Sequence, residues 1–335
     1  MNKIILFLAF FPIHLIAQTF QPIEGGPESS IRGMSVVNPL MVWLSGSNGW
    51  TATSKDGGNN WSWKQSAKYK AFDFRGIKAF SATKAVVMSS GTPGLILYTE
   101  DGGTNWTETY RNDSKEIFLD GISFYNDQQG LVYGDPIEGK MQLLKTEDGG
   151  KHWMNISENL NIPLEQGEAS FAASNTGIKT QNNGKTWIIT GGSKSRVYYS
   201  SDQGKSWEVF NTLMTQGAST QGAYSIGFWN AKTGVITGGD YKNNTVRVNN
   251  LMMTSNGGRS WQKAKINPWG FRSCITYLDK QTLIATGTSG TDLSKDGGNT
   301  WINLSAQSYN VVGVLKKSKT AVIAGNNGKV AILTL

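Results

Sequence analysis

The chain has few of the residues from which most catalytic centres are built. Among its 335 residues are one cysteine, Cys274, and two histidines, His14 and His152. Nucleophilic centres of the Ser-His-Asp or Cys-His type and histidine-built zinc sites need more than this. No Gly-x-Gly-x-x-Gly motif joins a strand to a helix, so no dinucleotide site is predicted. We predict no metal and no cofactor, and we interpret Cys274 as a small buried hydrophobic residue.

Dense runs of one charge and long apolar runs are also missing. The net charge of +8 is spread through the sequence, so nucleic acid is not a predicted partner, although anionic surfaces, glycans or acidic proteins are. The apolar run over residues 4–16 is shorter than the roughly 20 residues of a membrane span. Because Lys3 precedes it and Ala17 follows it, residues 1–17 are predicted to be a cleaved secretory signal. The mature chain, residues 18–335, is then periplasmic or secreted and has no transmembrane anchor.

Glycine, by contrast, is abundant, with 40 residues, and it recurs within one repeated motif. The motif reads Ser/Thr-x-Asp/Asn-x-Gly-x-x-Trp, and its six copies span residues 54–61, 99–106, 146–153, 200–207, 254–261 and 294–301. This pattern is typical of a tight hairpin. The Asp accepts hydrogen bonds from N–H groups of the turn, the Gly takes a positive φ, and the Trp begins the next strand. We therefore interpret the motif as a structural element and not as a binding site.

The spacing of the motif predicts the architecture. Its tryptophans recur every 40 to 54 residues, the length of one four-stranded propeller blade, and no stretch shows sustained helical periodicity. Seven first strands are predicted, each beginning with a polar residue and, in most, a small one. The last repeat stops after its third strand, and residues 19–23 are predicted to supply the missing outer strand. The predicted fold is all-β, a single seven-bladed propeller over residues 18–335 that is closed by its N-terminal strand and is monomeric.

One stretch imitates the motif. Residues 180–187 (TQNNGKTW) fit its pattern but lie only 20 residues before Trp207, and Trp187 runs directly into a predicted second strand. We interpret this stretch as a long loop within blade four, between a first strand that begins at Glu168 and a second strand over residues 187–192.

The motif resembles the Asp box of sialidase-like β-propellers over nearly the whole mature chain. The chain resembles the photosystem II assembly and stability factors and their bacterial relatives more closely. This resemblance rests on the DGGxxW sequence pattern, the seven predicted repeats and three further segments. Those segments are residues 167–174 (GEASFAAS), 238–241 (GGDY) and 287–290 (GTSG). The resemblance implies a binding scaffold with an arginine-rich surface for partner proteins, a role that Arg32, Arg75 and Arg272 are placed to carry.

By analogy with sialidase-like folds, the starts of the first strands surround a funnel on the ligand-binding face. The predicted ring is Arg32, Arg75, Asp120, Glu168, Tyr224, Arg272 and Asn310. The ends of the second strands are expected to add Asp135, Arg196, Asp240 and Tyr241 to the rim. Arginines offer flat, bidentate forks to a carboxylate, so one interpretation is a site for an anionic group. The other is a water-filled channel whose charges pair with each other.

Three functions are compatible with this ring. The preferred one is an exported, non-catalytic binding or assembly scaffold. The second is a sialidase-like glycosidase with Tyr224 as nucleophile, Glu168 as its activating base and Asp120 as acid/base, although the Arg-Ile-Pro signature of such enzymes is absent. The third is a carbohydrate-binding propeller that stacks sugars on Trp229, Trp269 or Tyr241. A catalyst predicts a hydrogen bond between Tyr224 and Glu168, whereas a scaffold predicts arginines on an open surface.

Overall fold

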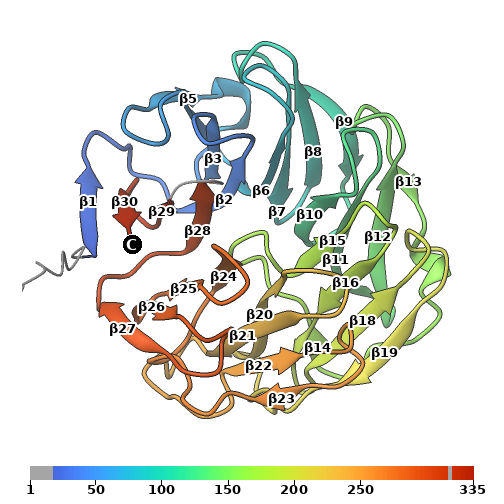
Figure 1. Cartoon of the computed structure of the whole chain (residues 1–335). Helices are drawn as coiled ribbons and strands as arrows, with labels where there is room; N and C mark the ends of the chain where they lie inside the picture. Colours follow the sequence, from blue (N-terminus) through green and yellow to red (C-terminus); the bar gives the residue numbers. More distant parts are fainter. Residues whose placement is uncertain (1–17, 316–318) are drawn as a thin grey trace, which may run out of the picture.

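The computed structural model describes residues 18–315 and 319–335, and in these residues the strands form seven antiparallel sheets arranged in a ring (Figure 1). Each sheet is one propeller blade, and its first strand lies nearest the centre of the ring. The predicted all-β, seven-bladed fold is therefore confirmed. The predicted signal over residues 1–17 lies outside the described residues. No helix in the described part of the chain is long and apolar enough to cross a bilayer.

Blades 1 to 4 follow one another along the first two thirds of the chain. Blade 1 contains β2 (Ile31–Val36), β3 (Val42–Gly46), β4 (Trp50–Ser54) and β5 (Ser62–Gln65). Blade 2 contains β6 (Asp73–Ala79), β7 (Ala85–Ser90), β8 (Gly94–Thr99) and β9 (Thr107–Asn112). Blade 3 contains β10 (Leu119–Phe124), β11 (Gly130–Ile137), β12 (Lys140–Thr146) and β13 (Met154–Asn155). Blade 4 contains β15 (Ile178–Thr180), β16 (Thr186–Ile189), β18 (Arg196–Ser200) and β19 (Glu208–Asn211).

Blades 5 to 7 complete the ring. Blade 5 contains β20 (Gln221–Phe228), β21 (Gly234–Asp240), β22 (Leu251–Thr254) and β23 (Gln262–Lys263), and the short strands β14 (Glu168–Ala169) and β17 (Gly191–Gly192) extend its sheet. Blade 6 contains β24 (Cys274–Tyr277), β25 (Leu283–Gly287), β26 (Gly290–Ser294) and β27 (Ile302–Ser305). Blade 7 contains β28 (Val311–Leu315), β29 (Thr320–Ala324), β30 (Val330–Thr334) and β1 (Thr19–Ile23). Two short 3₁₀ helices, η1 (Ala67–Tyr69) and η2 (Ser157–Asn159), lie in loops.

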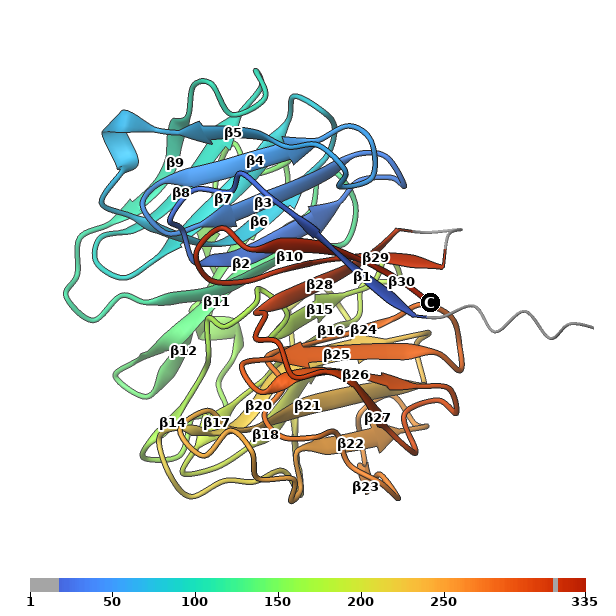
Figure 2. The ribbon, with the colours of Figure 1, turned by 90° about the vertical axis from the view of Figure 1, so that its left-hand side faces the viewer.

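The N-terminal strand closes the ring, as the sequence predicts. β1 pairs antiparallel with β30, with Thr19 opposite Thr334 and Ile23 opposite Val330, and it lies at the outer edge of blade 7 (Figure 2). Pro22 has no N–H to donate, and the outermost strand is where a sheet tolerates this. The closure joins the two ends of the chain within one blade and covers the edge that β30 would otherwise expose.

The repeated motif forms the expected turn between the third and fourth strands. In the first copy, Asp56 Oδ1 accepts the N–H of Asn60 at 2.9 Å, and Ser54 Oγ accepts the N–H of Gly58 at 2.8 Å. Gly58 has φ +96°, a conformation that glycine adopts without a steric penalty. The indole N–H of Trp61 donates to the carbonyl of Gly58 at 2.8 Å, which holds the ring over the turn.

The motif tryptophans also connect neighbouring blades. Trp207 of blade 4 lies in a buried cluster with Leu131 and Leu143 of blade 3, and Trp301 of blade 6 packs with Leu251 of blade 5. Each of these indoles is buried against the blade that precedes its own. Truncating such a ring costs about 3–5 kcal/mol, so the motif stabilises the ring as well as its own turn.

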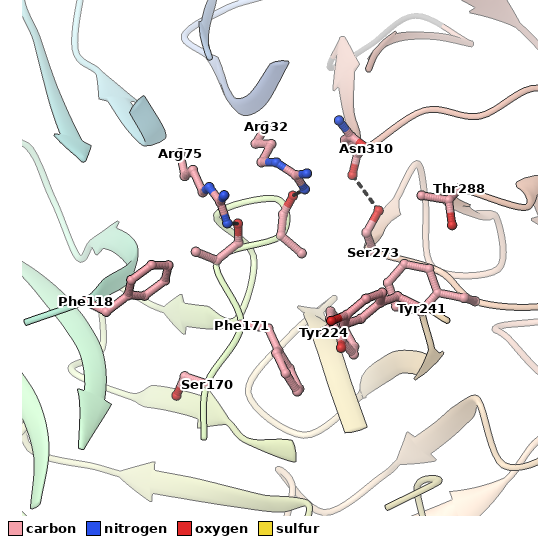
Figure 3. A pocket seen from close by; sticks show the side chains of 13 residues that line it. Arg32, Arg75, Phe118, Ser170, Phe171, Tyr224, Tyr241, Ser273, Thr288 and Asn310 are labelled. Atoms are coloured by element: carbon pink, nitrogen blue, oxygen red, sulfur yellow. Dashed lines mark hydrogen bonds between the residues drawn. The ribbon is translucent and has the colours of Figure 1, made fainter. Parts of the chain in front are cut away.

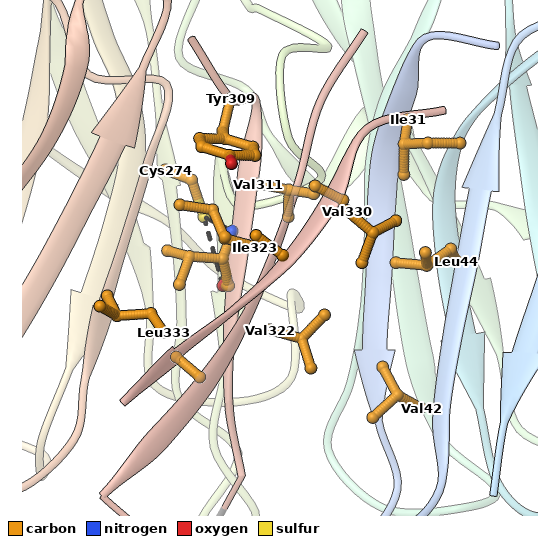
Figure 4. Close-up of a cluster of buried hydrophobic side chains, with 14 of the residues drawn as sticks. Ile31, Val42, Leu44, Cys274, Tyr309, Val311, Val322, Ile323, Val330 and Leu333 are labelled. Carbon is orange, nitrogen blue, oxygen red and sulfur yellow. Dashed lines mark hydrogen bonds between the residues drawn. The ribbon is translucent and has the colours of Figure 1, made fainter. Parts of the chain in front are cut away.

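The seam at blade 7 is filled by aliphatic side chains from three blades (Figure 4). Val311 and Ile323 of blade 7 pack with Leu44 of blade 1 and Cys274 of blade 6. Cys274 is fully buried, and its sulfur lies 3.5 Å from the backbone nitrogen of Val312, which donates to it. The interpretation of Cys274 as a small buried residue is therefore confirmed.

Blade 4 differs from the sequence prediction. Its first strand is β15, Ile178–Thr180, and not a strand that begins at Glu168, which lies in β14. Residues 180–187 do connect the first and second strands, but as a tight turn, because Thr180 pairs directly with Thr186. The prediction of a long loop there is wrong. Trp187 instead donates its indole N–H to Gly257 of the next blade at 2.8 Å.

Residues 170–177, which precede β15, occupy the centre of the ring. Ser174 Oγ donates to the carbonyl of Ser273 in blade 6 at 2.6 Å, and Asn175 Oδ1 accepts the N–H of Ile122 in blade 3 at 2.8 Å. The carbonyl of Thr176 accepts the N–H of Ile226 in blade 5 at 2.8 Å. This segment, which we call the plug, thereby separates a cavity at one end of the channel from a cavity at the other.

Candidate functional site

The first strands begin around a cavity of about 380 Å³ at one end of the channel (Figure 3). We call it the arginine cavity. Its lining comes from the starts of the first strands, from the plug and from two loops: Arg32, Arg75, Phe118, Ser170, Phe171, Ala172, Ala173, Tyr224, Tyr241, Phe271, Ser273, Thr288 and Asn310. The predicted ring residues Arg32, Arg75, Tyr224 and Asn310 and the predicted rim residue Tyr241 thus lie together.

A shared irregularity of the backbone positions several ring residues. In blades 1, 2, 3 and 5, pairing of the first strand with the second skips one residue near the start, and that residue is Arg32, Arg75, Asp120 or Tyr224, respectively. Such a bulge removes a residue from the ladder and turns its side chain out of the regular alternation.

The small residue after each bulge is required by packing. A Cβ on Gly33 would lie 2.1 Å from Ser45 Oγ, and one on Gly76 would lie 2.6 Å from Met88 Cγ. In blades 1, 2, 3 and 5 the polar-small pair at the strand start therefore coincides with the bulge.

Arg32 and Arg75 lie side by side and point toward the plug (Figure 3). Arg75 has a carboxylate partner, because its Nε donates to Asp73 Oδ2 at 2.7 Å, and its guanidinium lies 5.9 Å from the centroid of the Phe118 ring. Arg32 donates only one long hydrogen bond among the described residues, 3.3 Å from Nη1 to the carbonyl of Ala173, and its buried Nε has no partner there. Burial, followed by the charge of Arg75, lowers the pKa of Arg32. An anion placed between the two guanidinium groups would offset both effects.

An aromatic wall faces the arginines. The rings of Phe171 and Tyr224 are stacked, with 4.0 Å between centroids and 5° between planes, and Phe271 meets Tyr224 edge-on at 4.7 Å. Tyr224 is 3% exposed, and its hydroxyl donates to the carbonyl of Thr220 at 2.8 Å. Burial raises the pKa of Tyr224. Tyr241 is 47% exposed and forms the outer rim.

Glu168 and Arg196 pair with each other behind the cavity and do not line it. Arg196 Nη2 lies 2.5 Å from Glu168 Oε2, and the hydroxyl of Thr190 donates to Glu168 Oε1 at 2.5 Å. Arg196 also donates to the hydroxyl of Tyr198 at 2.6 Å. Both charged side chains are buried, and their bonds connect β14 to blade 4. The structure shows no hydrogen bond between Tyr224 and Glu168 in the described residues.

The remaining predicted residues also do not line the cavity. Asp135 is half-buried and accepts the N–H of Ser170 in the plug at 2.9 Å, and the other three are buried. Arg272 is fully buried and pairs with Asp292, and Asp240 accepts the N–H of Lys242 at 3.0 Å and so orders the loop after β21. Asp120 is 1% exposed, and burial, reinforced by the charge of Asp135, raises its pKa well above the usual value. Among the described residues, no group of three or more His, Cys, Asp or Glu side chains is arranged to hold a metal ion.

Sequence reasoning missed the apolar part of the cavity. Phe118, Phe171 and Phe271 line it, although none was predicted. The signal was present, because Phe118 lies two residues before Asp120 and Phe271 lies directly before Arg272, and both of these polar residues mark predicted strand starts. Phe171 lies in the plug.

Comparisons with known proteins agree with the fold. The sequence model described as photosynthesis system II assembly factor YCF48 matches residues 15–114 and 89–172, and that of the BNR/Asp-box repeat matches residues 198–209. A search of curated proteins finds no match. Among solved structures, YCF48 bound to D1 peptide aligns at 14% identity with a TM-score of 0.68, covering 98% of each chain.

Two further structures show the same architecture. YCF48 from Cyanidioschyzon merolae is 17% identical, with a TM-score of 0.69, covering 94% of this chain and 98% of that one. A GH74 xyloglucanase from Xanthomonas campestris is 13% identical, with a TM-score of 0.63, covering 94% of this chain but 53% of the enzyme. The fold and repeats define a β-propeller of the BNR/Asp-box class. Within that class the chain resembles the photosystem II assembly factor YCF48, whose sequence model matches residues 15–172 and whose solved structures have the same architecture.

Proposed function

We propose that this chain is a non-catalytic binding propeller whose arginine cavity receives an anionic group of a partner protein. The observation that carries the proposal is the pair of guanidinium groups of Arg32 and Arg75. Among the described residues Asp73 accepts a hydrogen bond from Arg75, whereas Arg32 donates only to the carbonyl of Ala173 and has no carboxylate partner. A carboxylate of a partner can accept from both arginines in bidentate fashion, and such charge-assisted bonds are stronger than neutral ones.

The cavity can also accommodate an apolar side chain of the partner next to its anionic group. Phe118 on one side and the stacked pair of Phe171 and Tyr224 on the other give apolar walls, so that an apolar side chain can be buried beside the carboxylate. A polypeptide fits this combination better than a sugar, whose hydroxyls would need more polar partners. An anionic glycan is the alternative ligand of the same cavity.

The relatives support a polypeptide partner. One solved YCF48 structure contains a D1 peptide, and that protein has the same architecture as this chain. Export to the periplasm or secretion is part of the proposal and rests on the apolar run over residues 4–16. A monomer is proposed as well.

The polar contacts also favour binding over glycoside cleavage. The hydroxyl of Tyr224 donates to Thr220, and Glu168 is held by Arg196 and the hydroxyl of Thr190. A base engaged in this way does not activate a phenol that lacks contact with it.

The test is capture of partners from the cell envelope of the source organism by the mature protein, followed by affinity measurement with the identified partner peptide. We expect Arg32→Ala and Arg75→Ala each to weaken binding at least tenfold. Arg111→Ala, which removes an exposed arginine paired with Asp113, is the matched control and should leave binding unchanged.

Two results would contradict the proposal. One is a partner whose affinity is the same for the wild type and for the double variant of Arg32 and Arg75. The other is turnover of a sialic-acid reporter that disappears in Tyr224→Phe, which would make the chain a glycosidase. If a sialylated oligosaccharide binds the wild type without turnover and binds the Arg75→Ala variant more weakly, the ligand of the arginine cavity is a glycan and not a peptide.

A further inference from the structure

The loop between β21 and β22, residues 241–250, exposes several apolar side chains. Tyr241, Val246 and Val248 are 47%, 45% and 63% exposed. Single exposed apolar residues are common on soluble proteins, whereas a group of them on one surface marks a place that another molecule covers. The loop is therefore a candidate interaction surface.

Two neighbouring segments extend this surface. The guanidinium of Arg247 lies 3.9 Å from the centroid of the Trp269 ring, which brings Trp269 to the loop. The hydroxyl of Thr215 donates to the carbonyl of Val248 at 2.6 Å, and Leu213 lies two residues before Thr215. Trp269 and Leu213 are 45% and 54% exposed. We call the five apolar side chains the loop patch: Leu213, Tyr241, Val246, Val248 and Trp269.

The backbone of the loop is hydrogen-bonded within the protein. The N–H of Val246 donates to the carbonyl of Asn243 at 3.1 Å, and the carbonyl of Asn244 accepts the N–H of Phe271 at 2.8 Å. The carbonyl of Val248 is bonded as described above. A peptide that adds as a strand binds through free main-chain groups, and these are already occupied. A lipid bilayer, by contrast, requires that the backbone be satisfied inside the protein.

The exposed charges at this surface are positive. Lys242 and Arg247 are both exposed, and neither is paired with a carboxylate in the part of the chain that the structure describes. Asp240 and Asp292 are buried, and each accepts a backbone N–H, that of Lys242 at 3.0 Å and that of Trp269 at 2.8 Å. A Lys or Arg near an anionic membrane strengthens binding about fivefold, and Trp and Tyr are enriched at the level of the lipid headgroups.

We propose that the loop patch docks on the surface of an anionic lipid bilayer. Val246 and Val248 insert at the boundary between headgroups and acyl chains. Trp269 and Tyr241 lie at the depth of the headgroups, and Arg247 pairs with lipid phosphates. Because Tyr241 also lines the arginine cavity, docking places the mouth of that cavity beside the membrane (Figure 3). This inference goes beyond the proposed partner binding and does not depend on it.

The probes are vesicles of phosphatidylcholine alone and vesicles of phosphatidylcholine and phosphatidylglycerol in equal parts, which carry negative charge. Co-sedimentation measures binding of the mature protein. The wild type should bind the mixed vesicles at least tenfold more tightly than the neutral ones, because its loop offers cations as well as apolar side chains.

A serine variant tests the apolar side chains without changing the net charge. Val246→Ser with Val248→Ser should weaken binding to the mixed vesicles about tenfold. The matched control is Leu40→Ser with Ile302→Ser, which removes two aliphatic side chains, 61% and 54% exposed, from other surfaces. The control should bind as the wild type does. Urea midpoints equal to that of the wild type show that both variants are folded.

A glutamine variant tests the charges. Lys242→Gln with Arg247→Gln should weaken binding to the mixed vesicles at least tenfold and leave binding to the neutral vesicles unchanged. Arg32→Ala with Arg75→Ala should have a much smaller effect, because both guanidinium groups lie inside the arginine cavity. A loss in this arginine variant as large as that in the glutamine variant would place the lipid in the arginine cavity and overturn the proposal.

A matched tryptophan pair locates the contact. Trp269 and Trp229 are 45% and 44% exposed, but Trp229 lines the cavity at the other end of the channel. Lipids with brominated acyl chains quench the fluorescence of tryptophans that touch them. The quenching by mixed vesicles should fall in Trp269→Phe and stay unchanged in Trp229→Phe.

Four results would overturn the proposal. Three are equal binding to the two kinds of vesicle, equal affinities of the loop serine variant and its control, and equal quenching in the two tryptophan variants. The fourth is a wild type that binds no vesicles. In that case a dimer that dissociates in Val246→Ser with Val248→Ser would assign the loop patch to a second copy of the chain, and weaker binding of the captured partner would assign it to that partner.

Discussion

The guanidinium of Arg272 and the carboxylate of Asp292 form an ion pair whose two side chains are fully buried, with 2.6 Å between Nη2 and Oδ2. Arg272 Nε also donates to Asp292 Oδ2 at 2.8 Å, and Nη1 donates to the hydroxyl of Ser289 at 2.6 Å. Asp292 in turn accepts the N–H of Trp269 at 2.8 Å. The pair therefore joins the start of blade 6 to its third strand. The two charges neutralise each other inside the blade and are not available to a ligand.

Removing one partner of this pair should destabilise the fold. We expect Arg272→Leu to lower the free energy of unfolding by about 3–5 kcal/mol, because it leaves the Asp292 carboxylate buried without its counter-ion. Urea denaturation followed by tryptophan fluorescence measures the change. Arg272→Leu combined with Asp292→Leu should recover much of the loss, since no unpaired charge remains.

Arg111→Ala is the control for this series, because its pair with Asp113 is exposed and should contribute no more than about 1 kcal/mol. A loss in Arg272→Leu as small as that in Arg111→Ala would show that the buried pair does not hold the blade together.

The sequence predicts the ring of blades well because each turn is encoded locally. The Ser, Asp, Gly and Trp of one motif bond to each other within eight residues, so the pattern alone indicates the hairpin. The bulges at Arg32 and Arg75 are likewise marked by the small residue that follows. These features depend on neighbours in the sequence.

The features that sequence reasoning missed depend on distant partners. Glu168-Ala169-Ser170 imitates the polar-small start of a first strand, but the chain there enters the centre of the ring as the plug. The true strand, Ile178–Thr180, has only three residues, and the polar-small pair Thr176-Gly177 that precedes it was overlooked beside the earlier imitation. Likewise, nothing in the sequence near Arg272 shows that Asp292 will neutralise it. Local patterns predict which residues reach the channel, and tertiary pairing decides which of them keep a free charge.

Asp120 should make the protein less stable as pH rises. Both carboxylate oxygens are buried without hydrogen-bond partners in the described structure, and burial raises the pKa of Asp120. A raised pKa in the folded state means that the folded protein holds this proton more tightly than the unfolded chain does. The stabilisation of the folded state by this tighter proton binding is therefore complete below the unfolded pKa, about 3.9. It is lost as pH rises toward the pKa of Asp120 in the folded state.

Asp120→Asn, which cannot ionise, should therefore gain stability relative to the wild type as pH rises from 4 to 8. Urea midpoints at pH 4, 6 and 8 measure the gain, and Asp113→Asn, an exposed substitution, is the control. A difference between the Asp120 variant and the wild type that is the same at all three pH values would show that Asp120 does not titrate as expected.

Asp101, in the second motif copy, should have the opposite dependence. Hydrogen bonds from the backbone N–H and then the side chain of Asn105 lower the pKa of Asp101 to about 2. A lowered pKa stabilises the folded state above the unfolded pKa, and this stabilisation is lost as pH falls from about 4 through 2.

Asp101→Asn is a conservative test, because Asn256 holds the same position in another copy and accepts the N–H of Ser260 at 3.0 Å. The variant should fold and should show a smaller loss of stability than the wild type between pH 4 and pH 2. An NMR titration of Asp101 gives its pKa directly, and an ordinary value near 4 would contradict the expected role of the turn.

The closure of the ring by β1 can be tested through its register. Gln21 lies opposite Ile332, whereas Leu333 is the partner of Phe20. Directly opposite residues of antiparallel strands have Cα atoms about 4.5–5.5 Å apart, within reach of a disulfide, and successive side chains point to opposite faces of the sheet. Gln21→Cys with Ile332→Cys should therefore form a disulfide on mild oxidation, and Gln21→Cys with Leu333→Cys should not.

Because the bond closes a loop of nearly the whole chain, it should stabilise the oxidised protein by up to about 5 kcal/mol, measured as a shift in the urea midpoint that dithiothreitol reverses. Equal crosslinking of both pairs, or of neither, would mean that β1 does not hold this register on β30.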